Sequence, residues 1–487
     1  MDGKERQEII HWQSDYSIVL EKSMKVDGEK GIAVMRSDAK ETSAGLGIGK
    51  QMETKLALLT QRARENPKRK YTSLAHLLNE DFLKECFWEL KRDKAAGIDG
   101  VSAKEYEANL EGNIKDLVSR MKAWKYKPQS VRRVYIPKGD GSKRGLGIPV
   151  TEDKVVQLGI KKILEAIFEA DFMDVSFGFR PNRSCHEALN VLDKTIMTKP
   201  VNYVVDMDIE KFFDTIDHKW LMECLRQRVV DRSLLRLIVR FLKAGIMEEG
   251  RFIETDRGTP QGGVISPILA NIYLHYILDL WFEKVIKKRF KGFAQLIRYA
   301  DDFVVCFQSG YEAELFAEML KQRLGKFGLK TAESKSRIVE FGRYAQEKAR
   351  KEGRRTETFD FLGFTHYISE TRRGKFKIGR KTSAKKFRQK LKEMNLWLKK
   401  VRNLVELKSW WEVLRLKLLG HHRYYGISGN LQALKKFCIQ TSNLAYKWIN
   451  RRSQKKSFTY AQFLKFEEYN SLPKPKIYRL MYTLSMC

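Results

Sequence analysis

The stretch "LIRYADDFVVCF" at residues 296–307 places two adjacent aspartates, Asp301 and Asp302, between two strongly apolar flanks. The apolar runs on both sides of a short acidic centre predict two β-strands joined by a turn. Neighbouring carboxylates repel, and partial burial raises the cost of ionising them. A bound divalent cation would offset both effects. Because aspartate is also a common turn former, a solvated hairpin turn remains the plain alternative.

A second run, "VNYVVDMDIEKFFDTIDH" at residues 201–218, begins as a β-branched strand and reaches Asp206 and Asp208 at its end. Sheet pairing can bring this strand end close to the turn at Asp301 and Asp302. Carboxylates from two strands can hold two Mg²⁺ ions at roughly 3.5–4 Å, the spacing of polymerases and nucleases. In a regular strand Asp206 and Asp208 share a face, so Asp206 is a candidate auxiliary ligand.

The overall charge points to a polyanionic partner. The 487 residues, 43% of them hydrophobic, are enough for two or more packed units. The 93 Lys and Arg against 60 Asp and Glu give a net charge of +33. Residues 371–487 hold 29 of these basic residues against only 5 acidic ones. With tryptophans interleaved, this region is the expected nucleic-acid surface.

Several classes of protein are disfavoured. The six cysteines are scattered without zinc-ligand spacing, which favours reduced thiols. No apolar run approaches the roughly 18 residues that span a bilayer, and the N-terminus lacks a signal-peptide core. We therefore expect a cytoplasmic protein with no membrane partner.

The order of predicted elements indicates an α+β fold, with helices against an antiparallel sheet and a helical region after it. Residues 1–50 end in "SAGLGIGK", which we interpret as a linker because no strand precedes it and no Gly-Lys-Ser/Thr follows. The remaining predictions are a helical lobe over 51–130, a β-hairpin with a basic tip over 131–150, helices over 152–172 and 312–327, a strand over 359–369, and basic helices after 380. Residues 257–286 are expected to be a glycine-rich loop that opens onto a long helix, with Ser266 as N-cap and Pro267 as its first residue.

Five motifs in this order resemble a reverse transcriptase of the group II intron maturase kind: "FGFRPNRSCHEAL" (177–189), "VVDMDIEKFFDTIDH" (204–218), "RGTPQGGVISPILANIYL" (257–274), "YADD" (299–302) and "FDFLGF" (359–364). Two later motifs, "LLGHHRYYGISGN" (418–430) and "AYKWINRRSQKKSFTYAQF" (445–463), are similar to the thumb and the short DNA-binding region of those proteins. The resemblance covers about residues 51–480.

The resemblance implies a right-hand polymerase followed by a helical region. The implied parts are a polar leader, ordered or disordered (1–50), the fingers (51–195), the palm (196–370), a helical thumb or maturase region (371–445) and a short basic DNA-binding region (446–487). Many relatives carry a further HNH nuclease, whereas this chain ends at "IYRLMYTLSMC". We therefore expect an endonuclease-lacking form, with priming from another nick or a replication fork as a hypothesis.

The resemblance also implies roles for single residues. Asp208 and Asp301 match the principal Mg²⁺ ligands and Asp302 completes the catalytic triad, with two Mg²⁺ expected and Mn²⁺ as a substitute. Asp206 is auxiliary, and Lys335 matches a position proposed to donate a proton to pyrophosphate.

Other positions are expected to contact substrates. An aromatic after the catalytic aspartate would exclude a ribose 2′-hydroxyl; Phe212 and Phe213 are both candidates, and at least one must be a core aromatic. The remaining dNTP-binding candidates are Lys138, Lys143, Arg144, Gln261 and Gly262, and the nucleic-acid-binding candidates are Arg180, Arg183, Arg451, Arg452, Lys455 and Lys456. Gly145 follows Arg144 where the family usually has proline, which loosens this tip.

We therefore expect an RNA-directed DNA polymerase that acts by two-Mg²⁺ nucleotidyl transfer. The expected partners are a structured intron RNA, an RNA template with a DNA primer, target DNA and dNTPs, in a bacterial-type, nucleoid-associated ribonucleoprotein. The protein would promote splicing of the intron RNA and copy it into DNA during intron mobility. Two alternatives remain: a splicing cofactor whose polymerase has decayed, against which the intact Asp208, Asp301 and Asp302 argue, and a reverse transcriptase adopted by its host.

Overall fold

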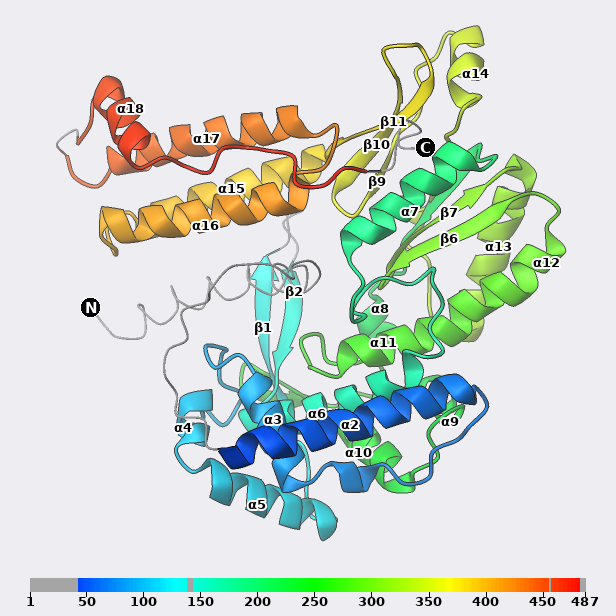
Figure 1. Ribbon diagram of the computed structural model, residues 1–487, viewed down its shortest axis with the longest axis vertical. Coiled ribbons are helices and arrows are strands. Elements are labelled where there is room, and N and C mark those ends of the chain that lie inside the picture. The colour runs from blue at the N-terminus through cyan, green and yellow to red at the C-terminus, as the bar shows by residue number, and fades with distance from the viewer. Residues whose placement is uncertain (1–42, 138–142, 455–456, 482–487) are drawn as a thin grey trace.

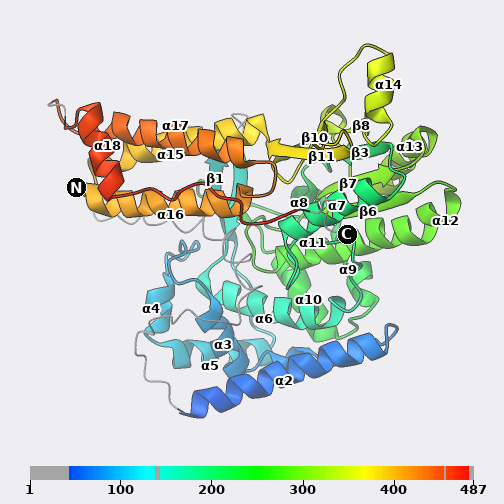
Figure 2. The ribbon, with the colours of Figure 1, turned by 45° about the horizontal axis from the view of Figure 1, so that its top comes forward.

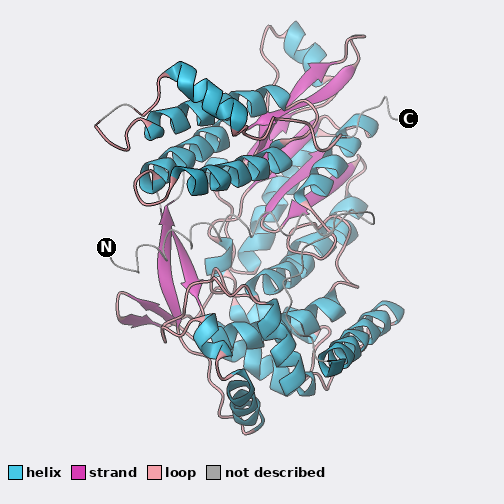
Figure 3. Ribbon diagram, turned by 60° about the vertical axis from the view of Figure 1, so that its left-hand side comes forward, coloured by secondary structure: helices cyan, strands magenta, loops and turns pink. Residues whose placement is uncertain are grey.

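The computed structural model describes residues 43–137, 143–454 and 457–481. It has three parts (Figure 1): an N-terminal lobe of helices with a small sheet, a central domain built on a four-stranded sheet, and a C-terminal helical region. Figure 3 shows two separate groups of strands, one at the left of the view and one at the upper right, with helices filling the lower part of the molecule. This arrangement confirms the predicted α+β fold class.

Among the described residues, five α-helices and one 3₁₀ segment form most of the N-terminal lobe, as the helical spacing of residues 51–130 and 152–172 predicts. The 3₁₀ segment η1 precedes α3, whose N-cap Asn79 accepts a hydrogen bond from the backbone of Phe82. A capping box between Ser102 and Glu105 starts α4. The helices are α2 (Ser43–Glu65), η1 (Ala75–Leu77), α3 (Glu80–Glu89), α4 (Ala103–Glu107), α5 (Leu110–Lys122) and α6 (Thr151–Phe168).

The first of these helices corrects the interpretation of "SAGLGIGK" as a linker. Helix α2 begins at Ser43, so residues 43–50 continue into the helical lobe and the expected leader (1–50) extends too far. Three glycines in this stretch disfavour helix intrinsically, by about 1 kcal/mol each. The apolar side chains that follow, such as Met52, are buried in the lobe and select the helix.

A four-stranded sheet rises from this lobe toward the C-terminal helices (Figure 1). Strands β1 (Val131–Pro137) and β2 (Lys143–Ile148) form the predicted hairpin, whose tip at 138–142 lies outside the described residues. Strand β1 also pairs in parallel with β4 (Ile246–Glu248), and β4 pairs with β5 (Arg251–Ile253). The strand order is β2-β1-β4-β5.

The central sheet has the order β6-β7-β3-β8, and all of its pairs are antiparallel. Both faces are buried: Val304 points into one hydrophobic cluster and Val305 into another. Burial on both faces explains why these strands are continuously apolar instead of alternating. The strands are β3 (Tyr203–Met207), β6 (Ala294–Tyr299), β7 (Asp302–Phe307) and β8 (Arg337–Glu340).

Helices cover both faces of this sheet. Helix α7 packs with Leu189 and Leu192 against the face of Val304, and α11 and α13 cover the face of Val305 with Leu269 and Phe316. Two π-helical segments, η2 and η3, follow α11 directly. The remaining elements of the central domain are α7 (Cys185–Thr198), α8 (Phe212–Thr215), α9 (His218–Arg226), α10 (Arg232–Leu242), α11 (Ser266–Leu274), η2 (His275–Asp279), η3 (Phe282–Ile286), α12 (Lys287–Arg289), α13 (Gly310–Lys326), η4 (Glu333–Lys335) and α14 (Ala345–Lys351).

A third sheet corrects the expected boundary at residue 370. Strand β10 (Phe364–Glu370) pairs with β11 (Phe376–Thr382) and with β9 (Phe359–Phe361), so that boundary cuts a hairpin. The charged run "SETRRGK" forms its turn, which explains why it looks like a linker in the sequence. The helical region begins instead at Ser383, the N-cap of α15.

The C-terminal helical region consists of α15 (Ala384–Val401), α16 (Leu407–Tyr425), α17 (Leu431–Ile449) and α18 (Tyr460–Tyr469). Trp397, Trp410, Trp411 and Trp448 are buried in its core. The first three pack on one another or on Phe463, and the Trp448 indole N–H donates to the Asn395 side chain at 2.8 Å. These tryptophans are therefore structural. The charge excess of this region lies on its surface.

A strap of chain returns from α18 along the helices to the central domain (Figures 1 and 2). It forms a parallel bridge between Arg479 and Ile427, and the Tyr478 N–H donates to the Gly426 carbonyl at 2.7 Å. Met481 is buried in the cluster that includes Phe364. The C-terminal region is thus attached to the central domain at both of its ends.

Within the described residues no helix is both long and apolar enough to cross a membrane.

Candidate active site

The turn that carries the two adjacent aspartates is formed as predicted. Strand β6 ends at Tyr299 and β7 begins at Asp302, and these two residues are paired. Ala300 and Asp301 form the two-residue turn between them. Ala300 has φ +59°, a left-handed conformation in which glycine is usual. A non-glycine residue there costs roughly 1–2 kcal/mol, so the surrounding structure must hold the turn in place.

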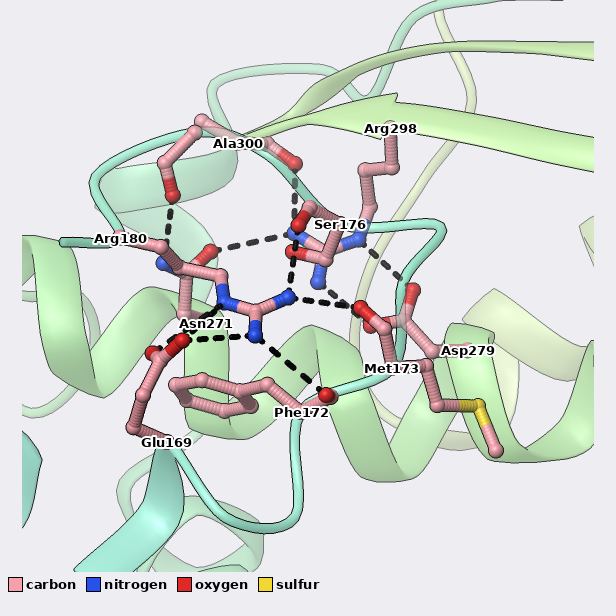
Figure 4. Close-up of polar contacts among 10 residues, drawn as sticks. Glu169, Phe172, Met173, Ser176, Arg180, Asn271, Asp279, Arg298 and Ala300 are labelled. Atoms are coloured by element: carbon pink, nitrogen blue, oxygen red, sulfur yellow. Dashed lines mark hydrogen bonds and ion pairs between the residues drawn. The ribbon is translucent and has the colours of Figure 1, made fainter. Parts of the chain in front are cut away.

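Arg298 supplies that hold from beneath the turn (Figure 4). Its guanidinium donates to the Ala300 carbonyl at 2.9 Å and to both carboxylate oxygens of Asp279 at 2.7 and 2.5 Å. Both side chains of this ion pair are fully buried. Asp279 is the last residue of the π-helical segment η2, and such segments often lie at functional sites. The turn is thereby anchored to the helix behind the sheet.

Strand β3 brings the other two aspartates to the same edge of the sheet. Asp206 lies in the strand opposite Val304 of β7 and Arg337 of β8, and its carboxylate accepts from Arg337 at 3.4 Å. Asp208 follows the strand directly and forms an ion pair with Lys335 at 2.6 Å. The sheet therefore brings together Asp206, Asp208, Asp301 and Asp302, as the sequence predicts.

The four carboxylates influence one another. Burial, and then the charges of Asp206, Asp301 and Asp208, raise the pKa of Asp302 to about 7. This side chain reaches solvent, but the protein around it displaces enough water for desolvation to dominate. Burial also raises the pKa of Asp206 to about 6 against the opposing effect of Arg337. Burial and then the charge of Asp208 raise the pKa of Asp301.

This donor set fits a hard divalent cation in its chemistry. Carboxylate oxygens are the ligands that Mg²⁺ prefers, and the mutual repulsion of the four groups favours a cation among them. In the described part of the chain, no group of three or more His, Cys, Asp and Glu side chains already surrounds a single point as a metal ligand set would. The ammonium group of Lys335 neutralises Asp208 instead.

A further backbone group at this edge was not predicted from the sequence. Leu362 and Gly363, in the turn between β9 and β10, have φ +49° and +81°, and the backbone of Leu362 donates a hydrogen bond that lowers the pKa of Asp302. The Leu362 carbonyl accepts from the Tyr424 hydroxyl at 3.0 Å. The motif "FDFLGF" therefore links Asp302 to the C-terminal helices. The glycine in its Leu-Gly pair is the one sequence signal of this tight turn, in which both residues have positive φ.

The hairpin β1–β2 brings two predicted dNTP ligands together. Arg144 donates to the Gln261 side chain at 2.7 Å, and Gln261 donates in turn to Asp214 at 3.3 Å. The charge of Arg144 also acts to lower the pKa of Asp301. Lys143 is exposed on the same strand, and Lys138 lies outside the described residues. Gly145 leaves room for the Arg133 side chain, whose Nε would lie 2.5 Å from an added Cβ.

Gly262 is required by the backbone. Its φ is +106°, and an added Cβ would lie 2.6 Å from the Gly147 carbonyl. The Gly147 N–H donates to the Gln261 carbonyl at 2.6 Å, so strand β2 rests directly on this loop. The loop and the basic hairpin therefore form one wall beside the aspartates.

The two candidate gate aromatics differ in their surroundings. Phe212 is 2% exposed and lies 6.5 Å from the ring of Tyr273 in the core. Phe213 is 8% exposed, and its carbonyl accepts from the Thr259 N–H at the start of the glycine-rich loop. At least one core aromatic was expected, and Phe212 has that role.

The prediction that Arg180 binds nucleic acid is wrong. Its guanidinium is buried against Glu169 and donates to the carbonyls of Met173 and Ser176, both at 2.7 Å (Figure 4). It also lies 5.4 Å from the centre of the Phe172 ring. All of its polar groups serve to fix the loop that leads into α7, which leaves none for a ligand.

The other basic candidates lie at the surface. Arg183 pairs with Asp174 and stacks over Phe177. Arg451 lies over the ring of Trp448 at the end of α17, and Arg452 is half-buried beside it. Lys455 and Lys456 lie outside the described residues. Binding by these residues stays a prediction.

Comparison with known proteins agrees with this geometry. Residues 136–366 match the family model described as reverse transcriptase (RNA-dependent DNA polymerase). The group II intron-encoded protein LtrA of Lactococcus lactis subsp. cremoris is 39% identical over 222 residues, which are 45% of this chain and 37% of that protein. Protein YkfC of Escherichia coli K12 is 35% identical over 237 residues, which are 43% of this chain and 62% of YkfC. Nuclear intron maturase 1 of Arabidopsis thaliana is 37% identical over 97 residues, which are 20% of this chain and 13% of that protein.

These matches confirm the resemblance to group II intron-encoded reverse transcriptases and maturases. The chain covers less than two thirds of the length of each of these relatives. The matched region contains all four aspartates, the Arg144–Gln261 wall and the π-helical segments.

Proposed function

We propose that the protein is an RNA-directed DNA polymerase, because residues 136–366 match the reverse transcriptase family model. The observation that carries the proposal is the meeting of Asp206, Asp208, Asp301 and Asp302 at one edge of the central sheet. In a right-hand polymerase the N-terminal lobe corresponds to the fingers, the central domain to the palm and the C-terminal helices to the thumb.

Asp208 and Asp301 would hold two divalent cations, with Asp302 completing the set and Asp206 as an auxiliary. Bound Mg²⁺ would activate the primer 3′-hydroxyl and neutralise the leaving pyrophosphate. The protein's own contribution is rigidity, because Arg298 fixes the turn of Asp301. Because the carboxylates repel one another, the site would be more stable with bound divalent cations than without them.

The Arg144–Gln261 wall is suited to the incoming nucleotide. A guanidinium can donate two hydrogen bonds to a phosphate, and Gln261 holds Arg144 toward the acidic edge. Gly262 permits close approach of a base pair to the backbone. Phe213, at the start of this wall, is our candidate for the residue that excludes a ribose 2′-hydroxyl.

Lys335 has a role in both states of the site. In the structure it neutralises Asp208, at a distance of 2.6 Å between ammonium nitrogen and carboxylate oxygen. Entry of a divalent cation at Asp208 would release this ammonium group. We propose that the released ammonium group would then protonate pyrophosphate.

We also propose that the protein binds a structured intron RNA, promotes its splicing and copies it into DNA at a target site. The relatives named for introns and for maturase activity support this proposal, as does the positive charge of residues 371–487. Template RNA, a DNA primer and dNTPs would be its other partners.

The polymerase proposal is tested by primer extension on an RNA template with Mg²⁺. The double variant Asp301→Ala plus Asp302→Ala should lose at least about a thousandfold in rate, because two ligands of the catalytic cations are removed. The matched control is Glu314→Ala plus Glu318→Ala, two exposed carboxylates on α13, which should extend like the wild type. Equal extension by the wild type and the Asp301/Asp302 variant would refute the metal site.

The splicing proposal needs a separate measurement. The Asp301/Asp302 variant should still promote splicing of the parent RNA at close to the wild-type rate, since binding rests on the basic regions. If this variant binds the RNA normally but no longer promotes splicing, the two activities are not separable as proposed.

A further inference from the structure

An open cavity of about 360 Å³ lies at the end of the central sheet that is remote from the aspartates. Its volume falls in the range of small-ligand sites, roughly 300–1,000 Å³. Aromatic rings, amides and one ion pair line it: Asn202, Tyr203, Gln308, Glu340, Tyr344 and Lys348. Asn202 has a buried Oδ1 without a hydrogen-bond partner, an acceptor that favours a ligand with a donor.

Helix α14 borders this cavity with one flank. Tyr344, Lys348 and Lys351 are spaced to share that flank, and Ala345 and Ala349 are buried beneath. Lys348 pairs with Glu340 at 2.7 Å, which holds α14 against strand β8. The Tyr344 side chain is 66% exposed, so one face of its ring is open to a stacking partner.

The turn between β10 and β11 lies on the other flank of α14 (Figure 1). Glu370 joins them, since it accepts from Gln346 at 2.5 Å and lies 3.9 Å from Arg350. The turn itself is tight: the Thr371 N–H donates to the Lys375 carbonyl at 2.8 Å, and Gly374 has φ +72°. It presents three exposed cations, Arg372, Arg373 and Lys375. None of them forms an ion pair with another described residue.

This surface is separate from the polymerase site. The cavity lies at Tyr203, the first residue of β3, whereas Asp208 follows the last, roughly 15 Å away along the strand. The tip of β10 is similarly seven residues from the turn at Leu362. A nucleic acid bound here is therefore a different segment from the primer end at the aspartates.

We propose that α14, the cavity beside it and the β10–β11 turn form a second RNA-binding surface, for an RNA helix with one unpaired nucleotide. The three cations of the turn would bind backbone phosphates, which lie on any RNA helix. The unpaired base would stack on Tyr344 and hydrogen-bond to Asn202, the mode in which proteins read splayed RNA bases. This inference rests on the proposed function and identifies where the structured RNA is held.

The test measures binding of two labelled RNA hairpins, one with a single bulged adenosine and one fully paired. The variant Arg372→Glu, Arg373→Glu, Lys375→Glu should bind both about tenfold or more weakly, and the slope of log K against log salt should fall by about two to three units. Tyr344→Ala should weaken binding of the bulged hairpin at least about fivefold and leave the paired hairpin within twofold.

A matched control reverses three exposed cations in and just after α12: Lys288→Glu, Arg289→Glu and Lys291→Glu. It changes the net charge by the same amount. The logarithm of its affinity for each hairpin should fall by less than half as much as in the Arg372/Arg373/Lys375 variant. Equal losses in the two triple variants would overturn the surface, and equal effects of Tyr344→Ala on both hairpins would overturn the base site. Primer extension on an unstructured template should persist in every variant. Failure of the wild type to bind either hairpin would also overturn the surface, whereas failure of the wild type to extend would instead refute the proposed function.

Discussion

The acidic edge of the central sheet and the layer beneath it use the same kinds of residue in opposite ways. Beneath the turn, Arg298 and Asp279 are fully buried, and each charge is matched by the other. At the edge, the charges of four aspartates are opposed by the nearby Arg337 and Lys335 and by the more distant Arg144, and the pKa values of three of the aspartates are raised. Matched charges fix the backbone, whereas an excess of one sign creates affinity for a cation.

The largest effect should come from breaking the matched layer. Arg298→Met leaves Asp279 buried without its partner and frees the Ala300 carbonyl, so the free energy of unfolding should fall by about 3–5 kcal/mol. Urea denaturation measures this loss. The double variant Arg298→Met plus Asp279→Leu should recover part of it, since no unpaired charge remains. A single variant as stable as the wild type would show that the pair does not hold the turn.

Arg180 provides a second test of the same distinction. Its removal in Arg180→Met leaves Glu169 and two loop carbonyls without their donor, which should cost about 2–3 kcal/mol of stability. Affinity for an RNA–DNA duplex should change less than twofold below the unfolding transition. A large loss of affinity with unchanged stability would restore Arg180 as a nucleic-acid ligand.

Another buried ionisable group, the His366 imidazole in β10, should make the stability of the protein depend on pH. His366 is fully buried, stacks on Phe359 at 4.8 Å and has no hydrogen-bond partner, and burial lowers its pKa to about 3. The unfolded chain binds a proton near pH 6.5 and the folded protein does not, so stability falls as the pH drops below about 6.5. At pH 5 the loss should be about 2 kcal/mol, at 1.4 kcal/mol per unit.

The control for this prediction is His366→Phe, which keeps the stacked ring and removes the titration. Thermal unfolding of both proteins at pH 7 and pH 5 should show a smaller acid shift for the variant. An identical shift would mean that His366 is not the group responsible.

The smallest effect concerns the acidic edge itself. Mg²⁺ at ten times its dissociation constant should stabilise the wild type by about 1.4 kcal/mol, a rise of a few degrees in Tm that chelation reverses. Asp301→Asn plus Asp302→Asn should be insensitive to Mg²⁺ and, because repulsion is relieved, more stable without it. A wild type whose Tm does not respond to Mg²⁺ would contradict the contrast between the two regions.

The sequence predicts the acidic edge because its signals are local. An apolar run on each side of Asp301 and Asp302 indicates a hairpin, and a β-branched run before Asp208 indicates a strand. The sheet then brings the two together, as its register shows. The basic hairpin at 131–150 was predicted in the same way.

The buried layer could not be predicted from the sequence. Arg298 and Arg180 look like surface residues, because Arg is rarely buried and its partner, Asp279 or Glu169, is 11 to 19 residues away in the chain. The boundary at residue 370 was wrong for a related reason, since "TRRGK" has the composition of a linker but the geometry of a hairpin turn. Only tertiary contacts decide these cases.

The strap from α18 gives the C-terminal region a second attachment to the central domain. The chain enters this region at Ser383 and leaves it at Met481, and the joints lie together: Ser428 bonds to the Met481 backbone, and Asn430 to Thr382. Two attachments along one line permit rotation about that line and resist bending away from it. Opening and closing over a duplex would thus be a rotation of the C-terminal helices about one axis. The Leu362–Gly363 turn lies close to this axis, between Tyr424 and Asp302, so the rotation would change the surroundings of Asp302.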